Sequence, residues 1–179
     1  MTTVNPADIS LRPATASDEP FLKRLHQSAR HWEFAALVQS GEVELYHKIM
    51  EQQYDSQQRF YFAHYDKAQY GVIQWCGRSI GRLYADYNDE EVRVLDIAIL
   101  PDYRGRGIGS IVITSLCLEA AMRHKPVRLC VHYLNRAVRL YQRLGFRRVG
   151  AEGPNYVMEW QQPDTQSCRR VAVRPVVES

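Results

Sequence analysis

Residues 101–110, PDYRGRGIGS, place three glycines and two arginines between two apolar segments. Glycine has no Cβ, so backbone N–H groups in such a loop can turn toward a bound group. The apolar residues after the loop recur at helical spacing from Gly107, and the N-terminus of a helix attracts anions. We therefore expect the loop to bind a phosphate-bearing ligand. Its predicted ligand-binding residues are Arg104, Gly105, Arg106, Gly107, Ile108, Gly109 and Ser110.

The glycine spacing excludes two common nucleotide-binding motifs. A P-loop requires a Gly-Lys pair, and the chain contains none. The dinucleotide fingerprint G-x-G-x-x-G would require glycine at position 110, which is Ser110. The spacing that remains is Arg-x-x-Gly-x-Gly, formed by Arg104, Gly107 and Gly109.

The elements that must position this loop follow the order β-α-α-β-β-β-α-β-α-β-β. The segment 92–100, VRVLDIAIL, is apolar on both faces toward its end, which is typical of a central strand covered by helices. Ser17 is the expected N-cap of the first helix, Cys76-Gly77 the expected hairpin turn, and Gly145 the expected C-cap of the last helix. The expected strands are 9–12, 70–76, 77–87, 92–100, 127–131, 146–150 and 155–160, and the expected helices are 18–31, 43–65, 107–125 and 135–145.

The charges of the chain are segregated along the sequence. The net charge is +3, but residues 104–148 hold nine arginines and one lysine against the single acid Glu119. This segment therefore carries +9 and the remainder −6. Such segregation indicates an anion site facing an acidic surface, although a solvated basic helix face would give the same pattern.

Length and composition predict one globular domain, residues 1–160, followed by a polar tail, residues 161–179. No apolar run approaches the ~20 residues that span a bilayer, and the N-terminal segment does not read as a secretory signal. We therefore expect a cytoplasmic protein without membrane contact. The cysteines form no C-x-x-C pair, which favours reduced thiols over a disulfide or metal site. These cysteines are Cys76, Cys117, Cys130 and Cys168.

Several segments together resemble the GNAT superfamily of acyl-CoA-dependent N-acyltransferases. The segment LDIAILPDYRGRGIG resembles the family's fourth strand and loop, and NRAVRLYQRLGF resembles its Asn-x-Ala…Leu-Tyr…Leu-Gly-Phe element. Upstream, RPATASDEPFLKRL resembles the first strand and helix. The resemblance covers residues 9–160 and implies an α/β (α+β) fold. In that fold a central mixed, mostly antiparallel sheet is flanked by helices and splayed between its fourth and fifth strands.

The resemblance also assigns roles to residues around that splay. The glycine-arginine loop would wrap the pyrophosphate of coenzyme A, while Asn135 and Ala137 would contact the same molecule. The backbone of Ile97, Ala98 and Ile99 would bind the pantetheine arm and stabilise the oxyanion of the tetrahedral intermediate. Tyr141 would protonate the departing CoA thiolate. A phenol suits this role because its ordinary pKa of about 10 keeps it protonated at neutral pH. Three arginines, Arg136, Arg139 and Arg143, could attract a further phosphate of CoA, or form a solvated face.

The general base has several candidates. Asp96 lies on the fourth strand, where family members with a carboxylate base often place it. A one-residue offset in a strand reverses the face of a side chain, so Asp96 could instead be structural. His132, Tyr133 or a chain of water molecules are the alternatives. A nucleophilic role for Cys130 is not expected, because direct transfer needs no covalent intermediate.

The acceptor pocket is expected to involve the first two helices and their connection. The aromatic residues there are Trp32, Phe34, Tyr46, Tyr54, Phe60, Tyr61, Phe62 and Tyr65. Most of them are expected to pack, and some to line an apolar cleft. An acidic group, formed by Asp86, Asp89, Glu90 and Glu91, could attract a cationic amine or simply be solvated.

The sequence therefore predicts an N-acetyltransferase that transfers an acetyl group from acetyl-CoA to a primary amine by direct attack in a ternary complex. The amine could belong to a small molecule, an amino acid or a protein N-terminus. The alternative is a non-catalytic CoA-binding sensor of the same fold. Nucleic-acid binding is not expected, because stacking aromatics are not interleaved with the arginines. A homodimer is expected, and a metal is not.

Overall fold

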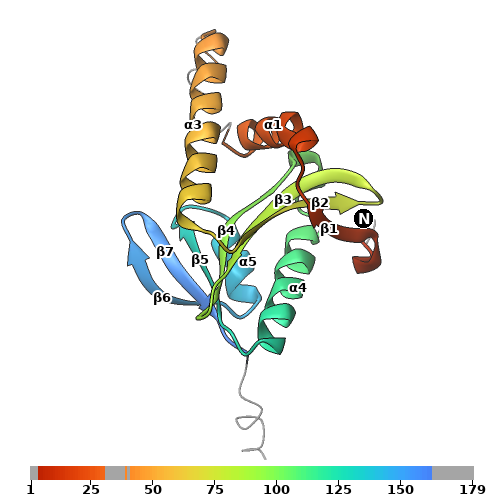
Figure 1. The fold of residues 1–179 in the computed structure, drawn as a ribbon, viewed down its shortest axis with the longest axis vertical. Coiled ribbons are helices and arrows are strands. Elements are labelled where there is room, and N and C mark those ends of the chain that lie inside the picture. Colours follow the sequence, from red (N-terminus) through yellow and green to blue (C-terminus); the bar gives the residue numbers. More distant parts are fainter. Residues whose placement is uncertain (1–3, 31–38, 40, 163–179) are drawn as a thin grey trace, which may run out of the picture.

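The computed structural model of the chain describes residues 4–30, 39 and 41–162 (Figure 1). Its strands form one sheet in the order β1-β2-β3-β4-β5-β7-β6. The strands are β1 Ile9–Pro13, β2 Ala68–Trp75, β3 Arg78–Tyr87, β4 Val92–Ile99, β5 Val127–His132, β6 Arg147–Glu152 and β7 Asn155–Trp160. The helices are α1 Glu19–Arg30, α3 Val43–His64, α4 Ile108–Met122 and α5 Ala137–Arg143, with short 3₁₀ turns at Pro6–Asp8, Ala16–Asp18 and Pro101–Tyr103.

Among the strands of residues 4–30, 39 and 41–162, one pair of neighbours is parallel. β4 and β5 run in the same direction, and all other described neighbours are antiparallel. The connection between β4 and β5 contains the glycine-arginine loop and α4, as a parallel crossover requires. The element order and the mixed, mostly antiparallel sheet are therefore confirmed.

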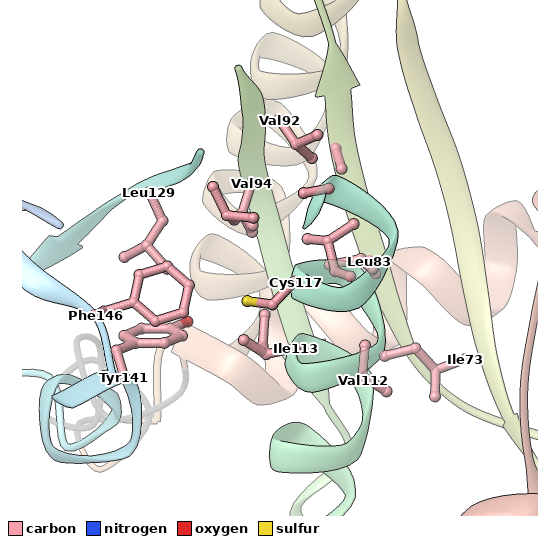
Figure 2. Close-up of a cluster of buried hydrophobic side chains, with 14 of the residues drawn as sticks. Ile73, Leu83, Val92, Val94, Val112, Ile113, Cys117, Leu129, Tyr141 and Phe146 are labelled. Carbon is pink, nitrogen blue, oxygen red and sulfur yellow. The ribbon is translucent and has the colours of Figure 1, made fainter. Parts of the chain in front are cut away.

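Helices cover both faces of the sheet, with α4 on one face and α1 and α3 on the other (Figure 1). The larger apolar core lies on the α4 face. It joins Ile113 and Cys117 of α4 to Val92 and Val94 of β4, and it extends to Tyr141 of α5. Figure 2 shows these side chains converging between α4 and the sheet. The α1 and α3 face holds a small apolar cluster of its own.

Local sequence signals fix the ends of several elements. Cys76 and Gly77 both adopt positive φ, 48° and 77°, which is the geometry of the hairpin turns that match strand twist. Gly145 follows α5 with φ of 93°, as expected for a helix C-cap.

The expectation that Ser17 is the N-cap of the first helix is wrong. Thr15 begins a 3₁₀ turn, and its N–H and hydroxyl both donate to the Asp18 carboxylate, at 2.8 and 2.9 Å, so the capping interactions bypass Ser17.

Within residues 4–30, 39 and 41–162, no helix is long and apolar enough to cross a membrane. The predicted tail, residues 161–179, lies outside the described residues except for its first two positions. Its separation from a domain of residues 1–160 stays a prediction.

Candidate active site

The glycine-arginine loop connects β4 to α4 and lies at the surface. Gly105 and Gly107 adopt φ of 73° and 85°, in the left-handed region that favours glycine. A Cβ at either position would meet no atom within 4 Å, so the backbone conformation, not space, requires glycine there. The surface above these two glycines is consequently open to a bound group.

The N-terminus of α4 presents unpaired donors beside this loop. The N–H of Ile111 donates to the carbonyl of Gly107 at 3.1 Å and is the first helical bond. The N–H groups of Ile108, Gly109 and Ser110 precede it and have no partner within the helix. Together with the helix dipole, they make this helix end suited to an anion.

Gly109 is the point where three elements meet. A Cβ built on Gly109 would lie 3.5 Å from Leu140 of α5 and 3.7 Å from Ile99 at the end of β4. The structure therefore brings the loop, the end of β4 and α5 together, as the sequence predicted for a common binding site.

The two loop arginines hold the loop while keeping most of their donors exposed. Arg104 donates through Nε to the carbonyl of Ile99 at 2.7 Å and through Nη2 to the carbonyl of Ser28, the latter at 3.5 Å. Arg106 donates through Nε to the carbonyl of Asp102 at 3.1 Å, and its guanidinium lies over the Trp75 ring, 5.7 Å from the centroid. A guanidinium has five N–H donors, so both side chains can fold the loop and still face an anion.

The splay between β4 and β5 begins in the middle of β4. The two strands pair only from Val92 to Val94, opposite 127–129. Beyond this point Ile97, Ala98 and Ile99 remain paired with β3 but have no partner on the β5 side. Backbone groups without a strand partner are available to a ligand. The predicted splay is therefore confirmed, and the three predicted residues lie along it.

Tyr141 projects from α5 into the core at the end of this splay. It is 5% exposed, and its ring packs against Phe146 at 5.6 Å between centroids (Figure 2). Burial raises the pKa of Tyr141 well above its ordinary value, and the negative charge of nearby Asp96 raises it further. The phenol is therefore protonated at physiological pH and can act as a hydrogen-bond or proton donor.

A β-bulge decides where Asp96 points. Tyr84 of β3 pairs with Asp96, while the next residue, Ala85, pairs with Val94, so Leu95 is an extra residue in β4. One extra residue reverses the face on which the subsequent side chains of the strand lie. Asp96 consequently shares the α1 and α3 face with Arg82 of β3, with which it forms an ion pair.

The alternative bases near β5 are less suitable. The N–H of Leu134 donates to Nδ1 of His132 at 3.2 Å, so a neutral imidazole there carries its proton on Nε2 and has no free acceptor nitrogen. The same ring stacks on Tyr133, with centroids 4.7 Å apart.

Cys130 is also poorly suited to act as a nucleophile. Burial raises the pKa of the Cys130 thiol, and Glu152 adds to that rise, which disfavours the thiolate form.

The start of α5 uses its predicted ligand-binding residues for capping. The side-chain oxygen of Asn135 accepts from the N–H of Ala137 at 2.9 Å, while the N-cap position itself is held by Arg136, whose side chain makes no capping bond. The arginines Arg136, Arg139 and Arg143 are exposed and form no ion pair within the part of the chain that the structure describes. Their charges are available to an anionic group at this end of the molecule.

The aromatic residues predicted for the acceptor side divide into two groups. Tyr46, Tyr54 and Tyr61 are buried on α3, whereas Phe60 and Phe62 are 50% and 66% exposed. Tyr65 is partly buried just after α3. Trp32 and Phe34 lie outside the described residues.

The acidic group does not form an exposed patch beside the splay. It lies at the opposite end of β4, where Asp86 and Glu91 are buried, Glu91 binds Arg93 and Arg128, and Asp89 binds Lys67. Within this group Asp89 and Glu90 are exposed, and Glu91 reaches β5 through its ion pair with Arg128.

Arg82 is the residue of this site that sequence reasoning missed. It is 2% exposed and donates toward Nδ1 of His26 at 3.3 Å as well as pairing with Asp96. The available signal was the presence of Arg82 and Asp96 in the mostly apolar parts of two adjacent segments. Opposite charges on neighbouring strands favour a cross-strand pair.

Comparison with known proteins agrees with this geometry. A family model described as an acetyltransferase (GNAT) domain matches residues 56–148, and no curated protein matches in a sequence search. Among solved structures, the chain is similar to the PaiA N-acetyltransferase from Thermoplasma acidophilum in complex with coenzyme A, with 16% identity and a TM-score of 0.63 over 86% of this chain and 99% of that chain.

Two further structures show the same fold. The ribosomal-protein-S18-alanine N-acetyltransferase from Escherichia coli has 15% identity and a TM-score of 0.58 over 88% of this chain and 97% of that one. An acetyltransferase from Thermus thermophilus has 19% identity and a TM-score of 0.60 over 89% and 97%. These identities are low, so the likeness concerns the fold. Because the family model spans more than half of the chain, the protein belongs to the GNAT acetyltransferase domain family.

Proposed function

We propose that the protein is an N-acetyltransferase that moves an acetyl group from acetyl-CoA to a primary amine by direct attack. The observation that carries the proposal is the continuity of three features. The unpaired end of β4, the positive-φ glycines and the free N–H groups of α4 follow one another along the chain. A similar fold has been solved with coenzyme A bound, in the Thermoplasma acidophilum protein.

In this proposal the loop residues 104–110 bind the pyrophosphate through N–H groups and arginine charge. The backbone of Ile97, Ala98 and Ile99 binds the pantetheine and polarises the acetyl carbonyl. A donor aimed at the developing oxyanion stabilises the transition state more than the ground state. Asn135 and Ala137 fix the start of α5, which in turn positions Tyr141 near the departing sulfur.

Two proton transfers complete the proposed reaction. Asp96 takes a proton from the acceptor ammonium, directly or through water, so that the amine can attack the thioester carbon. The carbon–sulfur bond then breaks, and Tyr141 donates its proton to the CoA thiolate. Burial raises the pKa of Tyr141, which keeps the phenol protonated, so that its proton is present when the thiolate forms beside it.

The acceptor is a primary amine of a small molecule, an amino acid or a protein N-terminus. The half-buried carboxylate of Asp96, 18% exposed on the α1 and α3 face, supports an acceptor that approaches from those helices as an ammonium. A homodimer and a cytoplasmic location stay predictions from the sequence.

The proposal is tested by calorimetric titration with acetyl-CoA, followed by thiol-release assays with polyamines, free amino acids and short peptides. Binding with turnover on one of these classes is expected. Tight binding without turnover on any class would favour the non-catalytic sensor, and absence of binding would contradict the proposal.

Replacing Tyr141 by Phe tests the assigned proton donor. The variant should bind acetyl-CoA normally and turn over about 100-fold more slowly, the lower range for loss of a general acid. Tyr87→Phe is the matched control, because that hydroxyl donates to Glu119 at 3.2 Å away from the splay. Equal turnover in both variants would remove Tyr141 from the mechanism.

A further inference from the structure

Arg82 is a charged side chain almost wholly buried beneath α1 and α3. It is 2% exposed, and burying a guanidinium is costly unless it is paired. Its Nη2 faces three groups, the Asp96 carboxylate, Nδ1 of His26 at 3.3 Å and the side-chain oxygen of Gln57 at 3.5 Å. These groups belong to β4, α1 and α3, so one guanidinium connects three elements.

The arrangement is poorly suited to stabilisation alone. Nε and Nη1 of Arg82 have no hydrogen-bond partner among the described residues. Its guanidinium also lies over the Tyr84 ring, 5.3 Å from the centroid. Replacing an incompletely satisfied buried ion pair by apolar residues is often neutral or stabilising. The pair therefore points to a role beyond holding the fold together.

The accessible end of the pair is the carboxylate. Asp96 is 18% exposed and Arg82 is 2% exposed, so a molecule on the α1 and α3 face meets the acid first. The adjacent bulge is fixed from α3, because the hydroxyl of Tyr61 donates to the carbonyl of Leu95 at 3.1 Å. The orientation of Asp96 consequently depends on contacts with both helices and with β3.

We propose that Arg82 is a positioning residue, which holds the Asp96 carboxylate aimed at the acceptor amine and ties it to α1 through His26 and to α3 through Gln57. This inference rests on the proposed function, in which Asp96 is the base. Arg82 itself touches neither substrate in this account. Removing Arg82 should therefore slow the reaction no more than removing Asp96 does.

Several charged or titratable groups surround Asp96 and constrain the experiment. Arg82 and Tyr84 face it from β3, Tyr141 lies near it from α5, and His26 reaches it through Arg82. Arginine can only donate, so Nδ1 of His26 accepts and the imidazole is neutral in this contact. The measurement is therefore made at one fixed pH, so that all variants are compared under the same conditions.

The test is a double-mutant cycle in the full chain, with Arg82→Gln, Asp96→Asn and the two combined. The readouts are kcat, KM for the best amine of the panel, and the Kd for acetyl-CoA. Each single variant should lose about 100-fold in kcat/KM with an unchanged Kd. The double variant should be no slower than Asp96→Asn alone, because the two residues act as a unit.

The control is Arg93→Gln, which breaks the ion pair with Glu91, 2.7 Å long, at the other end of β4. Its kcat should stay within about twofold of the unaltered chain, since Glu91 keeps its second ion pair, with Arg128, and lies at the end of β4 away from the splay. Multiplicative losses in the Arg82 and Asp96 double variant would overturn the proposal. So would normal kcat in Arg82→Gln.

Two outcomes separate this inference from the proposed function. If Asp96→Asn turns over normally, the base assignment is wrong and the inference falls with it. If Asp96→Asn is slow but Arg82→Gln is not, only the role of Arg82 is wrong.

Should Arg82→Gln fail to fold, as judged by thermal unfolding, Arg82→Lys replaces it in the cycle. The lysine keeps the charge but not the planar fork, so it should still slow the enzyme and still add nothing to Asp96→Asn.

Discussion

The two faces of the sheet are built by different physical means. On the α4 face, a continuous apolar core packs α4 against β3, β4 and β5 and reaches the first residue of α4, Ile108, which is 1% exposed. On the α1 and α3 face, the apolar cluster of the described residues is small, Leu22, Tyr54 and Val72, and a buried polar group surrounds Arg82. Packing holds the proposed donor site, whereas directed polar contacts add to buried side chains such as Leu25 and Met50 around the proposed acceptor site.

This difference has a consequence for function. Close-packed interiors resist small displacements, so the α4 face can hold a glycine loop in a fixed conformation, as the proposed binding of a pyrophosphate would require. Polar contacts are directional and easily changed by single substitutions, so the other face suits a substrate that differs from one enzyme to another. The fold would thus separate a constant donor task from a variable acceptor task.

The largest effect is expected from breaking the donor loop itself. Gly107→Glu places a side chain at φ of 85° and a negative charge where the pyrophosphate is proposed to bind. Acetyl-CoA binding should weaken by more than about 100-fold in calorimetry, since both bulk and like charge oppose it. Gly153→Glu, at φ of 54° in the β6–β7 turn, carries the same strain and charge away from the loop and should bind normally. Normal binding in Gly107→Glu would disprove the loop assignment.

The core of the α4 face is tested by truncating a fully buried side chain. Ile113 is 0% exposed on α4, so Ile113→Ala should lower the free energy of unfolding by about 2–5 kcal/mol. Leu118 lies on the same helix but is 61% exposed, and Leu118→Ala should change that free energy by less than about 0.5 kcal/mol. Chemical denaturation measures both. Similar values for the two variants would mean that packing does not hold this face.

The same contrast explains what the sequence could predict. Apolar periodicity and glycine positions report packing and backbone conformation directly, which is why the element order, the Cys76-Gly77 turn and the glycine-arginine loop could be predicted. The bulge at Leu95 could not, because one extra residue in a strand leaves no mark in the pattern of residue types. Yet that bulge decides which face Asp96 occupies.

Of the features described above, the polar contacts between side chains were the hardest to predict from the sequence. Pairing of Arg82 with Asp96 depends on the register between β3 and β4, which the intervening turn sets and which short-range signals do not specify. The same holds for the start of the first helix, where Ser17 was the expected N-cap but the capping contacts join Thr15 to Asp18. Both cases concern side chains brought together by strand pairing or by a turn, not by their own spacing.

The smallest effect is expected at Asp18, which joins β1 to α1 on the polar face. Arg12 donates to both carboxylate oxygens, at 2.7 and 2.6 Å, and these bonds hold the pKa of Asp18 well below its ordinary value, with Thr15 adding to the effect and burial opposing it. Arg12 is 35% exposed, and solvent screening limits what the pair contributes. Asp18→Asn should therefore cost about 1–2 kcal/mol of unfolding free energy at pH 7.

The unfolding free energy lost in Asp18→Asn should depend on pH, and the direction of this dependence follows from the lowered pKa of Asp18. A carboxyl whose folded-state pKa is lowered stabilises the fold above its unfolded pKa of about 3.9, and the contribution is lost as pH falls below that value. The deficit of Asp18→Asn should consequently shrink below pH ~4, whereas the deficit of Ile113→Ala should persist, since burial of a hydrocarbon involves no proton. Asp8→Asn, an exposed acid in the same N-terminal segment, is the control and should differ little from the unaltered chain at either pH. An Asp18→Asn deficit that stays constant with pH would show that the carboxylate charge does not hold the polar face.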